Sequence, residues 1–260
     1  MIRMICLDYD NTIYDHRQQK IPESAREALA AVRGKCRVVL ASGRFFRDSW
    51  NAPLLREIRP DGVIHANGAL IEADGMDLEE TRIDPEQQRQ VIEFAYQNGL
   101  CLGGLYQGVW YTSNRRKQIE RWGGNETLYA GAVRDTRELI GVPMHSLYLD
   151  DSVEAAQLIA ENFPLLRAPI MDEERGGADV LPHFLSKAYG LKRLAEHWNI
   201  PVEETAAVGD SMNDYEMVRE AGVGIAMGNA VSKLKEAADY VTADIGEDGL
   251  WKAFAYLGLV

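Results

Sequence analysis

The chain has 260 residues, of which 46% are apolar and 26% are charged, and its net charge is −12. These values exclude a disordered chain, a collagen-like fibre and a coiled coil, and the length allows one large domain or two modest ones. The negative charge argues against binding to nucleic acid or to an anionic membrane surface. A small anionic substrate remains compatible with it, because one site can be locally positive.

The cysteines and the apolar runs bear on the cellular compartment. Cys6, Cys36 and Cys101 are odd in number and widely spaced, so neither a disulfide framework nor a zinc site is expected. Free thiols suit a reducing environment, and we expect a cytoplasmic protein. The first apolar run ends too soon, at Asp8, for a signal peptide, and no run approaches the ~18 residues of a membrane span.

Short apolar runs recur along the chain and predict buried strands of a parallel sheet. These runs cover residues 4–7, 38–41, 63–66, 206–208 and 223–226. Apolar residues at helical spacing lie between them, at Ala25, Ala28, Leu29 and Val32, and again at Leu191, Leu194, Ala195 and Trp198. The alternation predicts an α/β fold with a doubly wound parallel sheet.

The middle of the chain has a different pattern. Asp84 and Pro85 are typical of a helix start, and Asn98-Gly99 of its end. A hairpin over 101–112, a strand over 144–149, a helix over 152–162 and two weaker strands within 165–181 follow, whereas 113–141 is hard to assign. We therefore expect an inserted α+β cap domain at 82–180 and a host domain made of 1–81 and 181–260.

Two carboxylates follow the first predicted strand, in Asp8-Tyr9-Asp10-Asn11-Thr12. Residues two apart in an extended segment point the same way, so Asp8 and Asp10 can face one site. That site would lie at the carboxyl edge of the sheet, where open α/β sheets bind ligands. Adjacent carboxylates repel each other, and Mg²⁺, which prefers oxygen ligands, would relieve the repulsion. The alternative is a solvated Asp-rich turn.

Potential phosphate contacts occur at two further places. Ser42 and Gly43 follow the second predicted strand, where a hydroxyl and a backbone N–H can both donate to a phosphate oxygen. The alternative is an ordinary helix N-cap serine. Lys187 lies in the first turn of a predicted helix, where its charge opposes the helix dipole. It is therefore a poor structural choice and a reasonable phosphate contact, although it could be a surface lysine.

The fourth predicted strand ends in Gly209-Asp210-Ser211-Met212-Asn213-Asp214. Asp210, Asn213 and Asp214 add oxygen ligands at the edge that already holds Asp8. Acidic residues in a first helical turn are common for dipole reasons alone. What favours a phosphoryl-transfer site is the joint occurrence of all four elements, each at a strand end or a helix start.

Together these motifs resemble those of the haloacid dehalogenase (HAD) superfamily, most closely the Cof-type phosphatases with a cap inserted after the third core strand. The matching segments are 8–12, 41–44, 186–187 and 209–214, with support from 67–69, 224–230 and 248–250. The resemblance covers the whole core, but the cap only by position and rough pattern.

The resemblance implies a role for each matching residue. Asp8 would be the nucleophile that forms an aspartyl-phosphate, and Asp10 the general acid and then the general base. The groups that hold the phosphoryl group would be Ser42, the Gly43 backbone, Lys187 and Asn213. Mg²⁺ would be bound by the Asp8 carboxylate, the Asp10 backbone carbonyl and Asp210, with Asp214 either a direct ligand or one step removed. Thr12 would brace the loop after the first strand.

The sequence departs from the family pattern at a few positions. Asn11 stands where glycine is usual, and asparagine tolerates the left-handed conformation that glycine adopts there. Ser211, Phe184 and Ala188 also replace common glycines. These changes could reshape the edge of the pocket, but they remove no catalytic group.

The favoured interpretation is a Mg²⁺-dependent phosphatase that hydrolyses a small phosphorylated metabolite, either a sugar phosphate or a phosphorylated cofactor. A sugar phosphomutase of the same superfamily and a non-catalytic binding module are the alternatives. The cap would supply specificity. Its candidate contacts are Tyr106, Trp110, Arg115, Arg116, His145 and Arg175. The two aromatic residues could instead pack the hairpin, and the arginines could be solvated surface.

Overall fold

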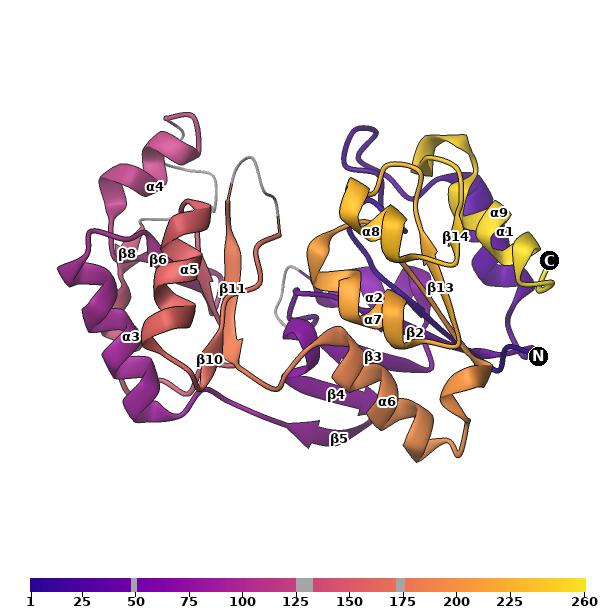
Figure 1. Cartoon of the computed structure of the whole chain (residues 1–260), viewed down its shortest axis with the longest axis horizontal. Coiled ribbons are helices and arrows are strands. Elements are labelled where there is room, and N and C mark those ends of the chain that lie inside the picture. Colours follow the sequence, from indigo (N-terminus) through magenta and orange to yellow (C-terminus); the bar gives the residue numbers. More distant parts are fainter. Residues whose placement is uncertain (48–50, 125–132, 172–175) are drawn as a thin grey trace. The chain divides into compact units, whose positions relative to one another are not determined.

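The computed structural model describes residues 1–47, 51–124, 133–171 and 176–260 (Figure 1). The chain divides into two compact units. The core unit comprises Met1–Phe46, Pro53–Glu80 and Leu185–Val260, and the inserted unit comprises Thr81–Phe184 together with Arg47–Ala52. The long inserted segment begins at 80/81 and ends at 184/185, where the sequence pattern placed the joints at 81/82 and 180/181, and the assignment of Arg47–Ala52 to the inserted unit was not predicted.

An eight-stranded sheet forms the centre of the core unit, in the order β14-β13-β12-β1-β2-β3-β4-β5. Six neighbouring strands are parallel: β1 (Met4–Leu7), β2 (Arg37–Ala41), β3 (Gly62–His65), β12 (Thr205–Gly209), β13 (Val223–Ala226) and β14 (Tyr240–Val241). The pairing confirms the five predicted parallel strands. Their residues are almost all buried, as is required of strands that are covered on both faces.

An antiparallel hairpin completes the sheet beyond β3 and was not predicted. It consists of β4 (Leu70–Ala73) and β5 (Met76–Glu80), joined at Asp74-Gly75. Both turn residues have positive φ, 51° and 78°, as a tight two-residue hairpin turn requires. The Asp-Gly pair was therefore a readable signal, but polar β5 lacks the apolar pattern of a buried strand.

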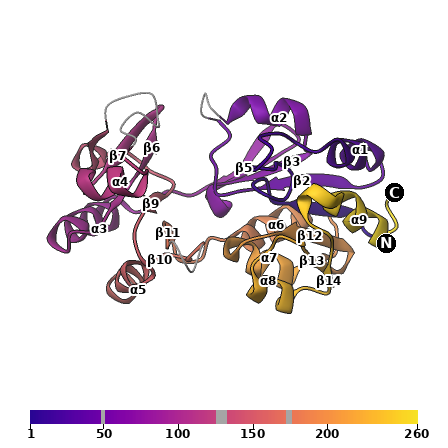
Figure 2. The same ribbon diagram turned by 90° about the horizontal axis from the view of Figure 1, so that it is seen from above.

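Helices cover both faces of this sheet (Figure 2). The first face carries α1 (Glu23–Ala31), α2 (Ala52–Ile58) and α9 (Gly249–Tyr256), and the other carries α6 (Lys187–His197), α7 (Tyr215–Glu220) and α8 (Ser232–Ala237). The predicted apolar stripes are confirmed in α1 and α6, where Leu29, Leu191 and Leu194 are buried. Each fully buried leucine stabilises the fold by about 1.5–3 kcal/mol. The doubly wound α/β fold is therefore confirmed.

The inserted unit has its own six-stranded sheet and its own apolar core. The strand order is β10-β11-β9-β6-β7-β8. Its strands are β6 (Leu102–Tyr106), β7 (Val109–Thr112), β8 (Arg134–Asp135), β9 (Leu147–Leu149), β10 (Leu166–Arg167) and β11 (Ala178–Pro182), and its helices are α3 (Pro85–Gln97), α4 (Arg115–Arg121) and α5 (Val153–Asn162). The α+β character is confirmed.

Capping side chains explain why the helix starts were predictable. The Asp84 carboxylate accepts the N–H groups of Glu86 and Gln87, both at 3.0 Å, and the Ser152 hydroxyl accepts that of Ala155. The strand predicted over 144–149 is confined to β9. The unassigned stretch contains α4, which is short and carries no apolar stripe.

Short 3₁₀ turns connect several elements, at Ala66–Gly68, Thr136–Leu139, Val202–Glu204, Met212–Asp214 and Ile245–Glu247. Among the described residues, no helix combines the length and the apolarity needed to span a membrane.

Candidate active site

The strand register brings the predicted motifs to one edge of the core sheet. Leu7 of β1 pairs with Val208 of β12 and with Leu40 of β2. The residues that follow these positions therefore emerge side by side at the carboxyl ends of three parallel strands. Backbone hydrogen bonds extend the order past the strands, because Asp8 N–H donates to Val208 O at 3.0 Å.

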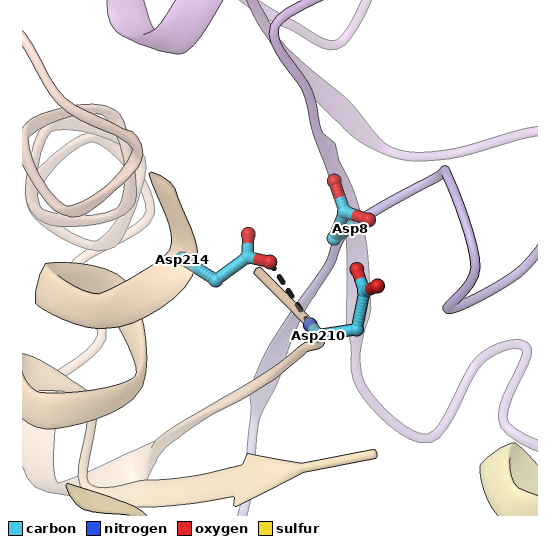
Figure 3. A group of neighbouring side chains, drawn as sticks. All are labelled: Asp8, Asp210 and Asp214. Atoms are coloured by element: carbon cyan, nitrogen blue, oxygen red, sulfur yellow. Dashed lines mark hydrogen bonds between the residues drawn. The ribbon is translucent and has the colours of Figure 1, made fainter. Parts of the chain in front are cut away.

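Three carboxylates converge at this edge, those of Asp8, Asp210 and Asp214 (Figure 3). One oxygen from each lies within 4.8 Å of the others. The Asp8 and Asp210 carboxylates lie next to each other, whereas one oxygen of Asp214 turns back toward the backbone. That oxygen accepts the N–H of Asp210 at 3.0 Å and the N–H of Ser211 at 3.1 Å.

A buried lysine connects two of these carboxylates. The Lys187 ammonium donates to Asp8 Oδ1 at 2.6 Å and to Asp214 Oδ1 at 2.7 Å, and its side chain is fully buried. The surface-lysine interpretation is therefore wrong. Burial alone would lower the pKa of Lys187, but Asp214 and Asp8 outweigh burial and raise it, so the lysine is charged.

Glycine at position 209 is required by this arrangement. A Cβ there would lie 2.4 Å from Asp214 Cγ, which is closer than such atoms approach. Because Gly209 has no side chain, the Asp214 carboxylate can pack against the backbone at the end of β12 and still reach Lys187.

The cluster carries more negative than positive charge. Burial raises the pKa of Asp8 to about 7, with Asp214 and Asp10 adding to the effect and Lys187 opposing it. Burial and the charges of Asp8 and Asp214 also raise the pKa of Asp210. One ammonium therefore does not balance these carboxylates, and a divalent cation with a preference for oxygen ligands suits the site.

The Asp10 carboxylate belongs to a different group of contacts. Arg44 donates to both of its oxygens, from Nε at 2.8 Å and Nη2 at 2.6 Å, and His16 Nε2 lies 2.5 Å from Oδ1. Burial alone would raise the pKa of Asp10, but His16 and Arg44 outweigh it and lower the pKa to about 2. Asp10 is therefore ionised. No role for Arg44 or His16 was predicted.

Ser42 lies in a loop and caps no helix. It is buried, and its hydroxyl accepts the N–H of Arg44 at 3.1 Å. The next described helix, α2, begins only at Ala52, so the N-cap alternative is wrong. The strand-to-helix turn expected at Ser42 and Gly43 does not lead directly into a helix, because the described residues 43–47 are not helical.

Asn67 is a site residue whose contacts the sequence did not reveal. Its side-chain oxygen accepts from Asn213 Nδ2 at 3.2 Å, and its backbone N–H donates to Ser42 O at 2.9 Å. It lies between Ala66 and Gly68 in a run with φ of 45°, 52° and 101°. Left-handed backbone is tolerated by asparagine but is strained at Ala66, and strained residues of this kind cluster at functional sites. Asn67 thus links two of the motifs.

The expectation for Asn11 is confirmed, because this residue has φ of 56°. Asn213, predicted to contact the phosphoryl group, lies in the turn that follows β12. Its side-chain Oδ1 accepts a hydrogen bond from Ser211 Oγ at 2.6 Å. Thr12, expected to brace the first loop, is fully buried.

The residues proposed as cap contacts differ in exposure. Trp110 is buried, donates to Gln118 Oε1 at 3.0 Å and packs edge-on against Trp122 and Tyr148, as the packing alternative requires. Arg115 and Arg116 are exposed, and Arg116 pairs with Glu120 of the same helix. Tyr106 and His145 are half-buried. Arg175 lies outside the described residues.

Comparison with known proteins agrees with this geometry. A family described as haloacid dehalogenase-like hydrolase matches residues 5–254. "Putative phosphatase YkrA" of Bacillus subtilis (strain 168) is 31% identical over 99% of this chain and 98% of its own length. "5-amino-6-(5-phospho-D-ribitylamino)uracil phosphatase YitU" of the same organism is 25% identical over 95% of this chain and 94% of its own.

Solved structures match as well, over nearly the whole of both chains. BT1666 from Bacteroides thetaiotaomicron, described among the phosphatases of the superfamily, superposes with a TM-score of 0.88 at 28% identity, covering 100% of this chain and 96% of its own. BT4131, described as a subclass IIB sugar phosphatase, has a TM-score of 0.86 at 25% identity, with 99% and 100% coverage.

Proposed function

Because the chain belongs to the haloacid dehalogenase-like hydrolases and is a phosphatase of that superfamily, we propose that it uses Mg²⁺ and an aspartyl-phosphate at Asp8 to hydrolyse a small phosphorylated metabolite. The observation that carries the proposal is the buried Lys187, held between Asp8 and Asp214 beside Asp210. A sugar phosphate or a phosphorylated cofactor precursor is the substrate class, in keeping with the names of two relatives.

The residues present fit a magnesium ion. Asp8 and Asp210 would supply carboxylate oxygens and Asp10 its backbone carbonyl, which leaves the Asp10 side chain free for proton transfer. Asp214 has a different task, because one oxygen accepts from Lys187 and the other from two backbone N–H groups. We assign it to positioning Lys187 and Asp210. When bound, Mg²⁺ would neutralise charge on the phosphoryl oxygens.

In the first step an Asp8 oxygen attacks phosphorus in line with the leaving group. The bond from phosphorus to the leaving oxygen breaks as the bond to Asp8 forms. Lys187, the Ser42 hydroxyl, the Gly43 N–H and the Asn213 amide would donate hydrogen bonds to the phosphoryl oxygens. In the second step a water oxygen attacks phosphorus, the bond to Asp8 breaks, and the carboxylate is regenerated.

Asp10 moves the protons in both steps. As an ionised carboxylate it is ready to accept a proton from the attacking water. To protonate a leaving alkoxide it must first carry a proton, which requires that it leave Arg44 and His16, because these two neighbours hold it ionised. The proton that Asp10 takes from water in the second step balances the proton that it gives to the leaving group in the first.

Substrate choice is assigned to the inserted unit. All four catalytic segments belong to the core unit, so the chemistry does not require residues 81–184. Segments that vary around a fixed catalytic centre commonly provide specificity. The inserted unit has an apolar core of its own and is able to serve as an exchangeable module.

The test is a screen of phosphorylated metabolites for release of inorganic phosphate by the full-length protein, with Mg²⁺ or with a chelator. We expect turnover of at least one sugar phosphate or phosphorylated cofactor precursor, in Mg²⁺ only, and none by Asp8→Asn. Equal release by Asp8→Asn or in the chelator would contradict the assigned mechanism. Transfer of the phosphoryl group within a sugar, without release, would make the protein a mutase.

A further inference from the structure

Positive charge is concentrated in one stretch of this acidic chain. Residues 20–60 contain nine Lys or Arg and four Asp or Glu, a net charge of +5, whereas the whole chain carries −12. This stretch includes α1 and α2, which lie on the same face of the core sheet (Figure 2). The concentration is local, so it can attract an anion despite the negative field of the rest of the molecule.

A groove of about 360 Å³ lies between these two helices. Its lining consists of two apolar residues, four arginines and one glutamate: Ile21, Leu29, Arg26, Arg33, Arg56, Arg59 and Glu57. Arg26 and Leu29 share one face of α1, because they lie three residues apart, and Arg33 follows just beyond the end of that helix. Ile21 and Leu29 are buried and give the groove an apolar base, and the exposed arginines surround it.

Contacts within the protein engage the groove arginines only in part. Arg26 pairs with Glu57 at 2.7 Å. Arg33 donates to Ile58 O at 3.3 Å and Arg59 Nε to Arg56 O at 3.4 Å, so both contact carbonyls near the end of α2. Such contacts stabilise a helix C-terminus modestly. They use one N–H of the five that each guanidinium carries.

Three of the four arginines have no acidic partner in the part of the chain that the structure describes. No Asp or Glu oxygen there lies within 4.0 Å of the guanidinium nitrogens of Arg33, Arg56 or Arg59. Clustered like charges repel, which favours binding of a counter-charge. Arginine is also the side chain best suited to phosphate and carboxylate, which it can bind through two parallel N–H groups.

We propose that this groove binds a small phosphorylated metabolite, at a second site distinct from the catalytic edge. The ligand carries at least two negative charges, which the three arginines hold, and an apolar or ring portion that covers Ile21 and Leu29. The groove has the size of a metabolite pocket. It shares no residue with the phosphoryl-transfer site.

The test measures binding by calorimetry to full-length Asp8→Asn protein in a chelator, so that nothing is hydrolysed. The probes are pyrophosphate, which has the charge alone, and ADP, which adds a ring system. The groove variant is Arg33→Gln/Arg56→Gln. The matched control is Lys233→Gln, because Lys233 is an exposed cation on α8, on the opposite face of the sheet.

We expect the parent protein to bind both probes, with ADP the tighter, and the groove variant to bind at least about tenfold more weakly while unfolding at the same temperature. The control should bind like the parent. No binding of either probe at about 10 mM, equal affinity of the groove variant, or an equal loss in the control would overturn the proposal. Tighter binding of polyglutamate than of ADP would also overturn it, by pointing to a macromolecular partner.

Discussion

Replacing Lys187 by methionine removes the cation that Asp8 and Asp214 share. Methionine has nearly the length of lysine and fills the same buried space without its charge. The two carboxylates would then stay buried, close to Asp210, without the ammonium that now donates to them at 2.6 and 2.7 Å. The variant therefore tests whether this lysine holds the site together.

The structure sets the size of the effect. Breaking a buried ion pair by removing one partner costs about 3–5 kcal/mol, because the remaining charge is left uncompensated. Two carboxylates depend on Lys187, so the loss should lie in the upper half of that range in the absence of metal. Mg²⁺ should restore part of the lost stability, because it brings positive charge to the same carboxylates.

Lys192→Met provides a matched control on the same helix. Lys192 pairs with Glu220 at 2.5 Å, but both side chains are exposed, at 53% and 41%. Exposed ion pairs contribute about 0–1 kcal/mol. Urea unfolding of both variants, in chelator and in Mg²⁺, gives the two free energies of unfolding to compare.

A double-mutant cycle with Asp8→Asn separates the interaction from general damage to the core. The loss caused by Lys187→Met should be smaller when Asp8 is already neutral, because one of the two stranded charges is gone. Equal losses for Lys187→Met and Lys192→Met, or a full loss in the Asp8→Asn background, would refute the assignment of Lys187 as the shared cation.

Further predictions concern pH, the metal, the proton carrier and the inserted unit. The folded-state pKa of Asp8, about 7, exceeds the unfolded value of about 3.9, so its contribution to stability is present below pH ~4 and is lost as pH rises through 7. Stabilisation by Mg²⁺, followed by thermal unfolding, should therefore be larger at pH 8 than at pH 5, and an equal shift at both would count against it. Asp210→Ala should lose phosphatase activity through weaker Mg²⁺ binding in calorimetry, and unchanged Mg²⁺ affinity would contradict this. Asp10→Asn should keep Mg²⁺ affinity but slow turnover by about 10²–10⁴-fold. An aryl phosphate should give a burst of leaving group that an alkyl phosphate does not give, and equal losses for both substrates would contradict the proton-transfer role of Asp10. Replacing residues 81–184 by a short linker should leave a folded core with altered substrate preference, and unchanged preference would exclude that unit as the specificity module.

The parts of the structure that could be predicted share a local cause. Strands such as β1 and β12 are buried on both faces, so almost their whole sequence is apolar and easily recognised. Asp8 and Asp210 directly follow such strands, and parallel strands necessarily end at one edge. Their proximity therefore followed from the order of the chain alone.

Other features depend on contacts between distant residues. Lys187 meets Asp8 across 179 positions of sequence, and its place in a first helical turn hinted at a phosphate contact but not at these two carboxylate partners. His16 reaches Asp10 because the intervening loop folds back, with isolated bridges from Asp10 to Tyr14 and from Asp15 to Lys20. No periodic pattern encodes such a loop.

The strained turn at Ala66 and Asn67 and the hairpin of β4 and β5 were missed for different reasons. Alanine gives no sign that it adopts a left-handed conformation, because the surrounding structure imposes it. The hairpin did carry an Asp-Gly turn signal, but its second strand is polar and mostly exposed at the edge of the sheet. The basic groove could not be inferred because its arginines lie on, or just beyond, two helices that only the fold brings together.

The central claim is that Asp8 carries the phosphoryl group between substrate and water, and intact-mass measurement tests it most directly. Asp10→Asn protein mixed rapidly with an aryl phosphate in Mg²⁺ should gain the mass of one phosphoryl group, because the first step proceeds while the second lacks its base. Peptide mapping should place the added mass on Asp8, and Asp8→Asn/Asp10→Asn protein should gain none. Leaving-group release without added mass, or added mass that persists when Asp8 is replaced, would contradict the account.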